Sequence, residues 1–312
     1  MNRRDFVKHT GLLGAHLLLS TPTLFSMNER QDIATLNGQF CGTPITIHAL
    51  PTGWVKVKRS HKGPGLGMPQ ILLDFRWTEW MPIYSWLIEH PEGNLLIDTG
   101  ENTQVMEDGY FACDPTVGWV NKQILQFNLI AQDEVTSYLR QLSYSPEDIR
   151  WLVLTHLHLD HVDGLHHFPR TEILVNQVEY QNPYGAVTCL LPPWFKPHQI
   201  QYRENDDPHF AGSYSLTQDG AIRIVPTPGH THGHQSVVVE MDTYRVFIAG
   251  DVSFSQSQLV KRKVAGICVD GKKARATYQS ILNFAKEKPL IYLPSHDPES
   301  GTRLSEESHL TA

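Results

Sequence analysis

The sequence predicts an α/β fold in which helices cover layers of strands. Two observations carry this prediction. Short apolar runs typical of buried strands alternate with segments of helical periodicity, and histidine-rich loops follow several of these runs in both halves of the chain. The chain has 312 residues, of which 40% are hydrophobic, and this is enough for a full core. Because no repeat, low-complexity tract or obvious linker divides the sequence, we expect one large domain.

The elements of the first half follow from turns and periodicity. Residues 133–142 are expected to form a helix because their apolar side chains fall on one helical face. Residues 145–148 are typical of a helix start or a tight turn, and they lead into a buried strand at 151–154. Four earlier segments are expected to be strands, the last two of them a hairpin: residues 45–48, 54–58, 83–89 and 95–98.

The second half repeats the pattern. Residues 272–286 are expected to form a helix with one apolar side. Residues 181–212 have little periodicity but many aromatic residues and prolines, which predicts an insertion or lid near the functional site. The apolar runs expected to be strands are 222–225, 236–241, 245–249 and 290–293.

Charge and cysteine content exclude several function classes. The net charge of −7 and the pI of about 6.2 offer no basic surface to nucleic acid, which disfavours an RNA-processing nuclease. The four cysteines form no C-x-x-C pair and therefore neither a zinc knuckle nor a redox motif. If they are oxidised, they can pair in three ways, among which the sequence does not choose. Nothing in the sequence specifies an oligomeric state.

The N-terminus resembles an export signal. Residues 2–8 contain paired arginines, as in a twin-arginine signal, and the apolar segment 11–19 that follows is too short for a permanent membrane span. The alternative is an amphipathic helix in which the two arginines occur by chance. We predict a signal over residues 1–26, cleavage near Ser26, and export of a mature domain of residues 27–312 to the periplasm without a stable membrane span.

The most informative motif follows the strand predicted at 151–154. It has the pattern H-x-H-x-D-H and contains His156, His158, Asp160 and His161. In an extended chain residues two apart point to the same side, so His156 and His158 can bind one ion. Asp160 continues this alternation, whereas His161 points elsewhere. The arrangement favours two metal ions over one, although a surface loop rich in histidine is the alternative.

Three further positions supply the ligands that this motif lacks. His230, Asp251 and His296 each come directly after a predicted strand. Because the ends of neighbouring strands can meet at one edge of a sheet, we expect all three to converge with the first motif.

These motifs, in this order, resemble those of metallo-β-lactamase-fold hydrolases over nearly the whole mature length. Asp98-Thr99-Gly100 matches an early turn of that family. The resemblance implies a four-layer αββα sandwich with a dinuclear metal site. It implies that His156, His158 and His230 bind the first ion, that Asp160, His161 and His296 bind the second, and that Asp251 bridges them. Five imidazoles and two carboxylates suit two divalent ions, with zinc favoured over iron, manganese or cobalt.

Neighbouring polar residues are given supporting roles. His232 and His234 compete with His230 as the ligand in this loop, and we expect His230 to bind while His234 orients a ligand. Asp98 is expected to support the metal loop without binding metal. Asp163 is expected to hydrogen-bond the loop that carries His161.

Two such ions lower the pKa of a bridging water, so a hydroxide exists near neutral pH and attacks an electrophilic centre. Asp251 is then catalytic as the bridging ligand, and Asp160 is placed to take and return the proton. The reaction class is therefore metal-assisted hydrolysis, and these residues alone do not fix the substrate.

The segments at 82–89, 95–100 and 227–236 most resemble N-acyl homoserine lactone lactonases. The resemblance implies a quorum-quenching enzyme that opens the lactone ring. True β-lactamases of this fold lack an aspartate at the position of Asp251, and flavodiiron-type oxidoreductases carry glutamate at the position of His158. A substrate with an apolar tail needs an apolar groove. Candidates for its lining are Trp77, Trp80, Met81, Trp194 and Phe195.

One position departs from the lactonase pattern. The related lactonases commonly have a tyrosine three residues after the bridging aspartate, where this chain has Phe254. Either another group assists the substrate carbonyl, or the substrate differs. The second reading is therefore an exported organophosphate or aryl ester hydrolase of the same fold. A non-catalytic zinc-binding protein is the third, and it gives no reason for Asp251 to stand among the histidines.

Overall fold

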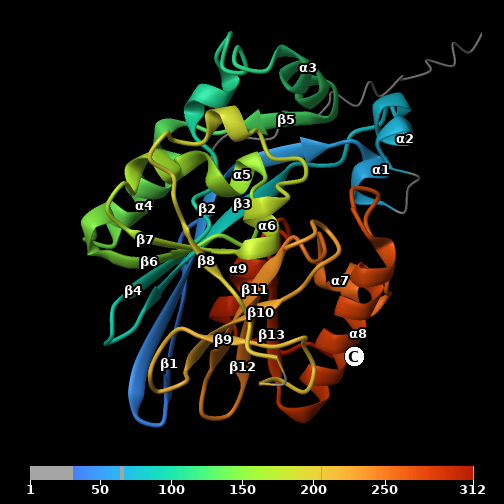
Figure 1. Ribbon diagram of the computed structural model, residues 1–312. Helices are drawn as coiled ribbons and strands as arrows, with labels where there is room; N and C mark the ends of the chain where they lie inside the picture. Colours follow the sequence, from blue (N-terminus) through green and yellow to red (C-terminus); the bar gives the residue numbers. More distant parts are fainter. Residues whose placement is uncertain (1–30, 64–66, 205, 312) are drawn as a thin grey trace, which may run out of the picture. The chain divides into compact units, whose positions relative to one another are not determined.

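Two β-sheets face each other in the computed structural model, which describes residues 31–63, 67–204 and 206–311 (Figure 1). The first sheet has eight strands in the order β1-β2-β3-β4-β6-β7-β8, with β5 paired to β2. It is antiparallel from β1 to β4 and parallel from β4 to β8. Its strands are β1 (Ala34–Phe40), β2 (Thr43–Val57), β3 (Met81–Glu89), β4 (Asn94–Ile97), β5 (Leu125–Asn128), β6 (Ile149–Val153), β7 (Glu172–Asn176) and β8 (His198–Ile200).

The second sheet has five strands in the order β13-β12-β11-β10-β9. Its strands are β9 (Tyr214–Ser215), β10 (Ile222–Pro226), β11 (Gln235–Glu240), β12 (Arg245–Gly250) and β13 (Leu290–Pro294). The α-helices are α1 (Arg59–Lys62), α2 (Met68–Leu73), α3 (Pro115–Ile124), α4 (Val135–Gln141), α5 (Leu159–Val162), α6 (Gln177–Gln181), α7 (Gln256–Val260), α8 (Gly271–Glu287) and α9 (Ser300–Ser305). Short 3-10 turns are η1 (Thr103–Met106), η2 (Ala131–Asp133), η3 (Pro146–Asp148), η4 (Asp163–His167) and η5 (Thr188–Leu190).

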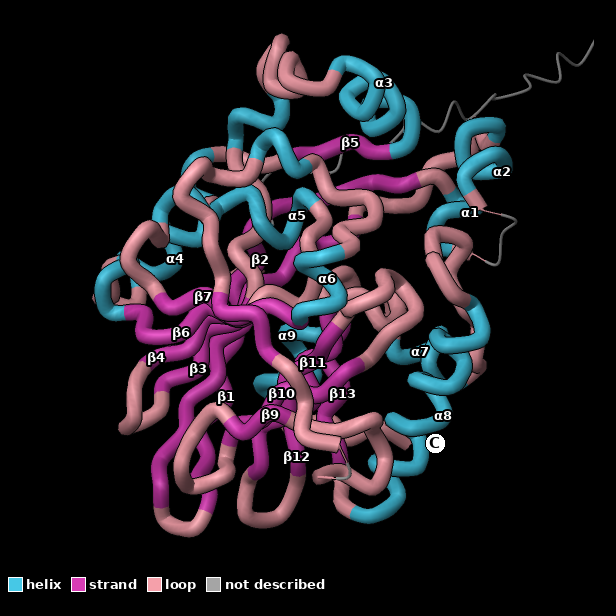
Figure 2. The backbone as a smooth tube through the Cα atoms, viewed as in Figure 1, coloured by secondary structure: helices cyan, strands magenta, loops and turns pink. Residues whose placement is uncertain are grey.

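The alternation of side chains along each strand builds four layers. Val153 of β6 packs between the two sheets, whereas its neighbour Leu152 packs on the side of α4. In the second sheet Val237 faces the first sheet, and Val238 packs against α8. Helices therefore cover the outer face of each sheet, as Figure 2 shows with strands in magenta between helices in cyan. The predicted αββα sandwich is confirmed.

Most predicted elements appear within a few residues of their expected bounds, but two differ. The early strands expected at 45–48 and 54–58 are one bent strand, β2, whose pairing register shifts between Pro51 and Trp54. Gly53 lies in this irregularity with φ 129°, a conformation that favours glycine. The insertion expected at 181–212 is partly regular, since β8 lies within it and extends the first sheet through pairing with β7.

Strand direction brings the proposed ligand loops together. β4 and β6 run parallel, as do β12 and β13. β10 and β12 are each antiparallel to β11, so they run in the same direction as each other. The loops that carry the predicted ligands therefore leave their sheets at corresponding strand ends, where α/β proteins place their functional groups.

The described residues from Asp32 onwards form one compact unit. The export signal predicted for residues 1–26 lies outside the described residues, and the boundary at residue 27 stays a prediction. Within the described part of the chain, no helix has the length and apolar character needed to cross a membrane.

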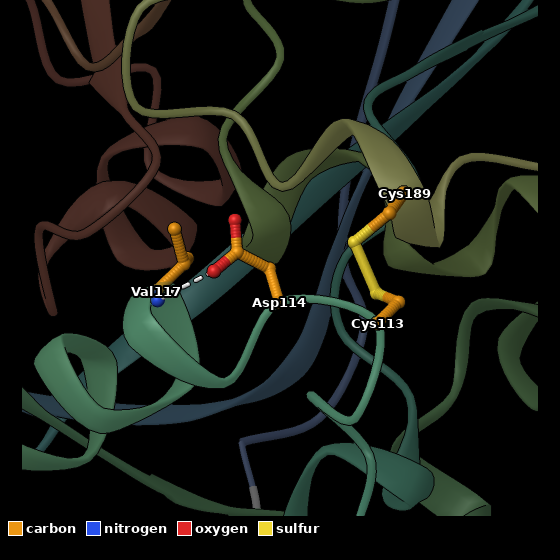
Figure 3. Close-up of a disulfide and its surroundings, with 4 residues drawn as sticks. All are labelled: Cys113, Asp114, Val117 and Cys189. Atoms are coloured by element: carbon orange, nitrogen blue, oxygen red, sulfur yellow. Dashed lines mark hydrogen bonds between the residues drawn. A yellow bond between two sulfur atoms is a disulfide. The ribbon is translucent and has the colours of Figure 1, made fainter.

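Cys113 and Cys189 form a disulfide, one of the pairings that the sequence left open. Their Cα atoms are 6.1 Å apart, and 76 positions separate them in the chain. Figure 3 shows the bond next to Asp114, whose carboxylate accepts a hydrogen bond from the Val117 amide at 3.0 Å and caps α3. The bond ties the loop before α3 to η5 of the insertion. Cys41 and Cys268 are free.

Removing this disulfide is expected to lower the free energy of unfolding by about 2–4 kcal/mol, because the bond restricts the unfolded chain. Urea unfolding of Cys113→Ser under oxidising conditions measures the change. Cys41→Ser is the matched control, since this exposed cysteine is unpaired, and it should unfold like the unmodified protein. Equal stability of the oxidised and reduced protein would contradict the expectation.

Candidate metal centre

The structure brings all seven predicted ligands to one place. Each side chain comes from a loop or short helix at a strand end. His156 follows β6, His230 follows β10, and His296 follows β13. Within the described residues, histidine and carboxylate atoms that could share an ion form three overlapping groups here. These are His156, His158 and His230; His156, His161 and Asp251; and Asp160, His161 and His296.

The first predicted ligand set consists of three imidazoles. His230 Nε2 lies 3.0 Å from His158 Nδ1. In each of these two rings, the nitrogen that faces away from the other ring (the outer nitrogen) donates to a carbonyl. His158 Nε2 donates to Tyr184 O at 3.1 Å, and His230 Nδ1 donates to Ile267 O at 3.3 Å. The inner nitrogens of these neutral rings therefore face each other with lone pairs, and a cation between them would stabilise that arrangement. Two nitrogen ligands of a tetrahedral zinc ion are separated by about 3.4 Å, so only a small outward shift of the rings separates this spacing from that of a zinc site.

The second predicted set joins an aspartate to two imidazoles. Asp160 Oδ2 lies 3.3 Å from His296 Nε2, and Asp160 Oδ1 lies 3.9 Å from His161 Nε2. The Nδ1 nitrogens of both rings are again hydrogen-bonded. His161 Nδ1 donates to Asp98 Oδ2 at 2.7 Å, and His296 Nδ1 donates to Pro82 O at 2.9 Å. Both rings are thus fixed with the inner nitrogen free to bind metal.

Asp251 lies between the two sets. Its Oδ1 is 3.4 Å from His161 Nε2 and 3.3 Å from His296 Nε2, both in the second set. Its Oδ2 is 3.4 Å from His230 Nε2, in the first set. One oxygen faces each set, which is the arrangement that a bridging carboxylate needs.

Unpaired buried atoms test whether the centre fits metal ions. His156 Nε2, His161 Nε2 and Asp251 Oδ1 are buried without a hydrogen-bond partner. A buried polar atom without a partner costs about 1–3 kcal/mol, so three at one point are unfavourable unless a ligand pairs them. All three belong to the predicted ligand sets, and the residues therefore fit the metal ions.

Electrostatics separates the two sets. Burial holds the pKa of His156 and His230 well below the ordinary value, so both rings are neutral and able to bind metal. Burial also lowers the pKa of His161, but the Asp251, Asp98 and Asp160 carboxylates outweigh it and raise that pKa well above its usual range. The electrostatic potential at the second set is thus the more negative of the two, and it attracts positive charge more strongly.

The local conformation of the motif differs from the sequence prediction. Asp160 does not continue the extended alternation, because it lies with His161 in the first turn of α5, whose N-cap residue is His158. Consecutive residues in a helix point about 100° apart. This turn allows the adjacent Asp160 and His161 to face the same ligand set.

The supporting residues act largely as predicted. His234 is buried and accepts a hydrogen bond from the Asp251 amide at 3.0 Å, so it positions a ligand and does not join the ligand groups. Asp98 accepts from the Thr155 amide at 2.7 Å as well as from His161. Asp163 differs from the prediction, because its carboxylate accepts a hydrogen bond from the Asn102 side-chain amide at 2.5 Å and thus contacts the segment after β4.

Because Gly250 has no side chain, the His234 ring can lie close to the backbone at this position. Gly250 has φ 56°, and a Cβ atom there would lie 2.8 Å from His234 Nε2 and 2.8 Å from Thr155 Cβ. A side chain at this position would therefore displace the residues that hold Asp251.

The predicted groove residues divide between core and surface. Met81 is buried, and Phe195 is largely buried between the first sheet and its helices. Trp77 lies under the Lys58 ammonium, at 3.8 Å from the ring centre. Trp80 lines a cavity of about 370 Å³ together with Phe111 and Phe127.

Sequence reasoning missed Glu179, which joins two ligand loops. One oxygen of this buried residue of α6 accepts a hydrogen bond from the Leu157 amide at 3.1 Å, between two predicted ligand histidines. Its other oxygen accepts from Thr231 Oγ1 at 2.7 Å and from the Gly233 amide at 3.0 Å, beside His230. Only the unusual burial of a carboxylate identifies it, and burial is visible only in the structure.

Glu179→Gln is expected to weaken metal binding about 10–100-fold, as loss of a group that orients metal ligands commonly does. The amide has one acceptor oxygen where the carboxylate uses two, so one loop loses its support. Titration of the metal-free protein against a competing chelator measures the change. Glu172→Gln is the control, because that glutamate is exposed, and unchanged affinity in Glu179→Gln would show that the loops hold their positions alone.

A fourth group of metal-type residues lies elsewhere and does not fit an ion. His90, Glu92 and Asp219 are close together. Both nitrogens of His90 are already paired, since Nε2 donates to Asp219 at 3.0 Å and Nδ1 accepts from the Glu92 amide at 3.2 Å. This group is a hydrogen-bonded pair with no free lone pair on the imidazole.

Residues 78–296 match the protein family described as the metallo-beta-lactamase superfamily. The chain belongs to the metallo-β-lactamase superfamily. The family and fold expected from the resemblance are thereby confirmed, and the matched segment contains all seven predicted ligands.

Individual members of the superfamily are similar over most of the chain. An N-acyl homoserine lactonase of Bacillus sp. is 27% identical over 226 residues, which are 70% of this chain and 82% of the relative. A structure of an N-acyl homoserine lactone hydrolase, with the product N-hexanoyl-L-homoserine at its catalytic metal centre, matches with a TM-score of 0.67 and 23% identity. It covers 82% of this chain and 94% of its own. The dizinc quorum-quenching lactonase AidC matches with a TM-score of 0.58 and 16% identity, covering 86% and 92%.

Proposed function

We propose that this chain is a dinuclear metal-dependent hydrolase that opens the lactone ring of N-acyl homoserine lactones. The observation that carries the proposal is the Asp251 carboxylate, with one oxygen toward each of two ligand sets. The lactonase of Bacillus sp. supports the choice of substrate.

His156, His158 and His230 would hold one divalent ion, and Asp160, His161 and His296 the other. Zinc is the proposed metal, because imidazole and carboxylate suit it and the related AidC is described as a dizinc lactonase. When bound, such a pair of ions lowers the pKa of water and polarises the ester carbonyl.

The residues around the centre have separate tasks. Asp98, through His161, and Glu179, through two loops, fix the ligand geometry. The Asp160 side chain is 18% exposed, whereas that of Asp251 is 6% exposed. Of the two aspartates Asp160 is therefore the one accessible to substrate, and it can take a proton from the attacking water and return it to the leaving alkoxide.

The cavity lined by Trp80, Phe111 and Phe127 is the proposed site for an apolar acyl tail. Phe111 also packs in a cluster with Leu159, which lies between the ligands His158 and Asp160. The cavity thus adjoins the metal loop through a continuous apolar contact.

Export to the periplasm is proposed on two grounds. The sequence at residues 2–8 resembles a twin-arginine signal. The Cys113–Cys189 disulfide supports an oxidising compartment, because such bonds seldom persist in the cytosol.

A second candidate function is hydrolysis of organophosphate or aryl esters at the same centre. Phe254 favours it, since this ring is buried, stacks on His296 with ring centres 5.5 Å apart, and has no hydroxyl to donate to a lactone carbonyl. A non-catalytic zinc-binding role would not account for the exposure of the Asp160 side chain.

A substrate panel on metal-loaded protein separates these functions. It contains acyl homoserine lactones of several tail lengths, simple aryl esters and a phosphotriester. We expect lactone opening to have the highest kcat/KM. Turnover of the phosphotriester without lactone opening would replace the first proposal by the second.

A further inference from the structure

His61 is a buried histidine beside the centre that neither the ligand sets nor their supports include. It lies in α1 and is 8% exposed. Its Nδ1 is buried without a hydrogen-bond partner. Leaving such a group unpaired costs about 1–3 kcal/mol, so its presence needs a reason.

Two contacts place His61 at the centre. Its ring meets Phe254 edge to face, with ring centres 5.9 Å apart, and Phe254 in turn stacks on the proposed ligand His296. The backbone makes the second link. The Ile267 amide donates to His61 O at 3.1 Å, and Ile267 O accepts from the proposed ligand His230.

The position of α1 is also fixed by close backbone contact with the loop that contains Gly266. A Cβ atom at Gly266 would lie 1.9 Å from Ser60 O, so this loop and α1 touch through backbone alone. His61 is therefore held by the same loop that holds His230, on the side of the centre where Phe254 lies.

We propose that the His61 imidazole donates a hydrogen bond to the substrate's carbonyl oxygen, a task for which position 254 offers no hydroxyl. This inference rests on the proposed ester hydrolysis and adds a catalytic residue to it. The donor stabilises the negative charge that develops on that oxygen when water attacks the carbonyl carbon.

The protonation state is consistent with this role. Burial, with a smaller contribution from His158, lowers the pKa of His61 to about 3, against raising effects from Asp160 and Asp251. The ring is thus neutral at pH 7, with one N–H to donate and no charge to repel the metal ions.

Three variants test the proposal on metal-loaded protein. His61→Phe keeps the ring and removes the donor, and we expect kcat/KM for lactone opening to fall about 10²-fold. His61→Gln keeps an N–H donor and should recover much of that loss. His48→Phe makes the same change at another buried histidine, which bonds Thr35 and Glu89, and should leave kcat/KM unchanged.

Melting temperature and metal content separate this role from a structural one. Because Nδ1 has no protein partner, His61→Phe should melt no lower than the unmodified protein and should bind the same amount of metal. Less metal, less stability, activity within threefold of the unmodified protein, or no recovery in His61→Gln would each overturn the proposal.

Failure of the proposed function is recognised separately. If the unmodified protein opens no lactone, the lactonase proposal falls. The same variants are then compared on the aryl ester or phosphotriester that the protein does hydrolyse. On such a substrate, the same loss of activity with His61→Phe would support the donor role, and full activity would refute it.

Discussion

Asp251→Asn is expected to lower kcat for ester hydrolysis on the order of 10³-fold and to reduce bound metal from two ions towards one. The carboxylate presents one oxygen to each ligand set, whereas the amide has a single acceptor oxygen and carries no charge. A loss of 10³-fold corresponds to about 4 kcal/mol of transition-state stabilisation. Steady-state kinetics and elemental analysis of the same preparation measure both effects.

Asp114→Asn is the matched control for this variant. Asp114 caps α3 through the Val117 amide, and asparagine caps a helix equally well, so activity and metal content should not change. His158→Ala, which removes a ligand of the first set, should resemble Asp251→Asn in both measurements. Full activity of Asp251→Asn with two ions still bound would refute the bridging role.

Asp98→Asn is expected to lower affinity for the second metal ion about 10²-fold, with a loss of turnover at least as large. The carboxylate can only accept, and it therefore fixes the His161 proton on Nδ1 and leaves Nε2 for the metal. An amide can donate to Nδ1 and move the proton to Nε2, where it blocks binding. A wrong histidine tautomer of this origin costs about 10⁴-fold in serine proteases.

The measurement is a two-ion titration of metal-free Asp98→Asn against a chelator. Asp219→Asn is the control, because it removes an equivalent aspartate from the buried His90, outside the centre. We expect it to leave both affinities unchanged. If Asp98→Asn weakened the two ions equally, Asp98 would support the loop as a whole and not the tautomer of His161.

Much of the centre was predictable because its ligands follow strands directly. His156, His230, Asp251 and His296 each stand within a few residues of an apolar run, so local pattern and strand direction are enough to bring them together. The conformation of Asp160 and His161 was not predictable. A four-residue helix such as α5 has no periodicity to detect, and it forms because of its tertiary surroundings.

Residue type and local periodicity by themselves predicted a layered α/β fold, seven candidate ligands and the absence of a hydroxyl at Phe254, whereas the four-layer αββα arrangement followed from the resemblance of these motifs to a known family. Only the tertiary structure decided that Glu179 joins two ligand loops, that Cys113 pairs with Cys189, and that His61 lies beside Phe254. These contacts join residues from 22 to 193 positions apart. No local pattern records such pairs, since they arise when the packing of the two sheets brings distant loops to a common edge.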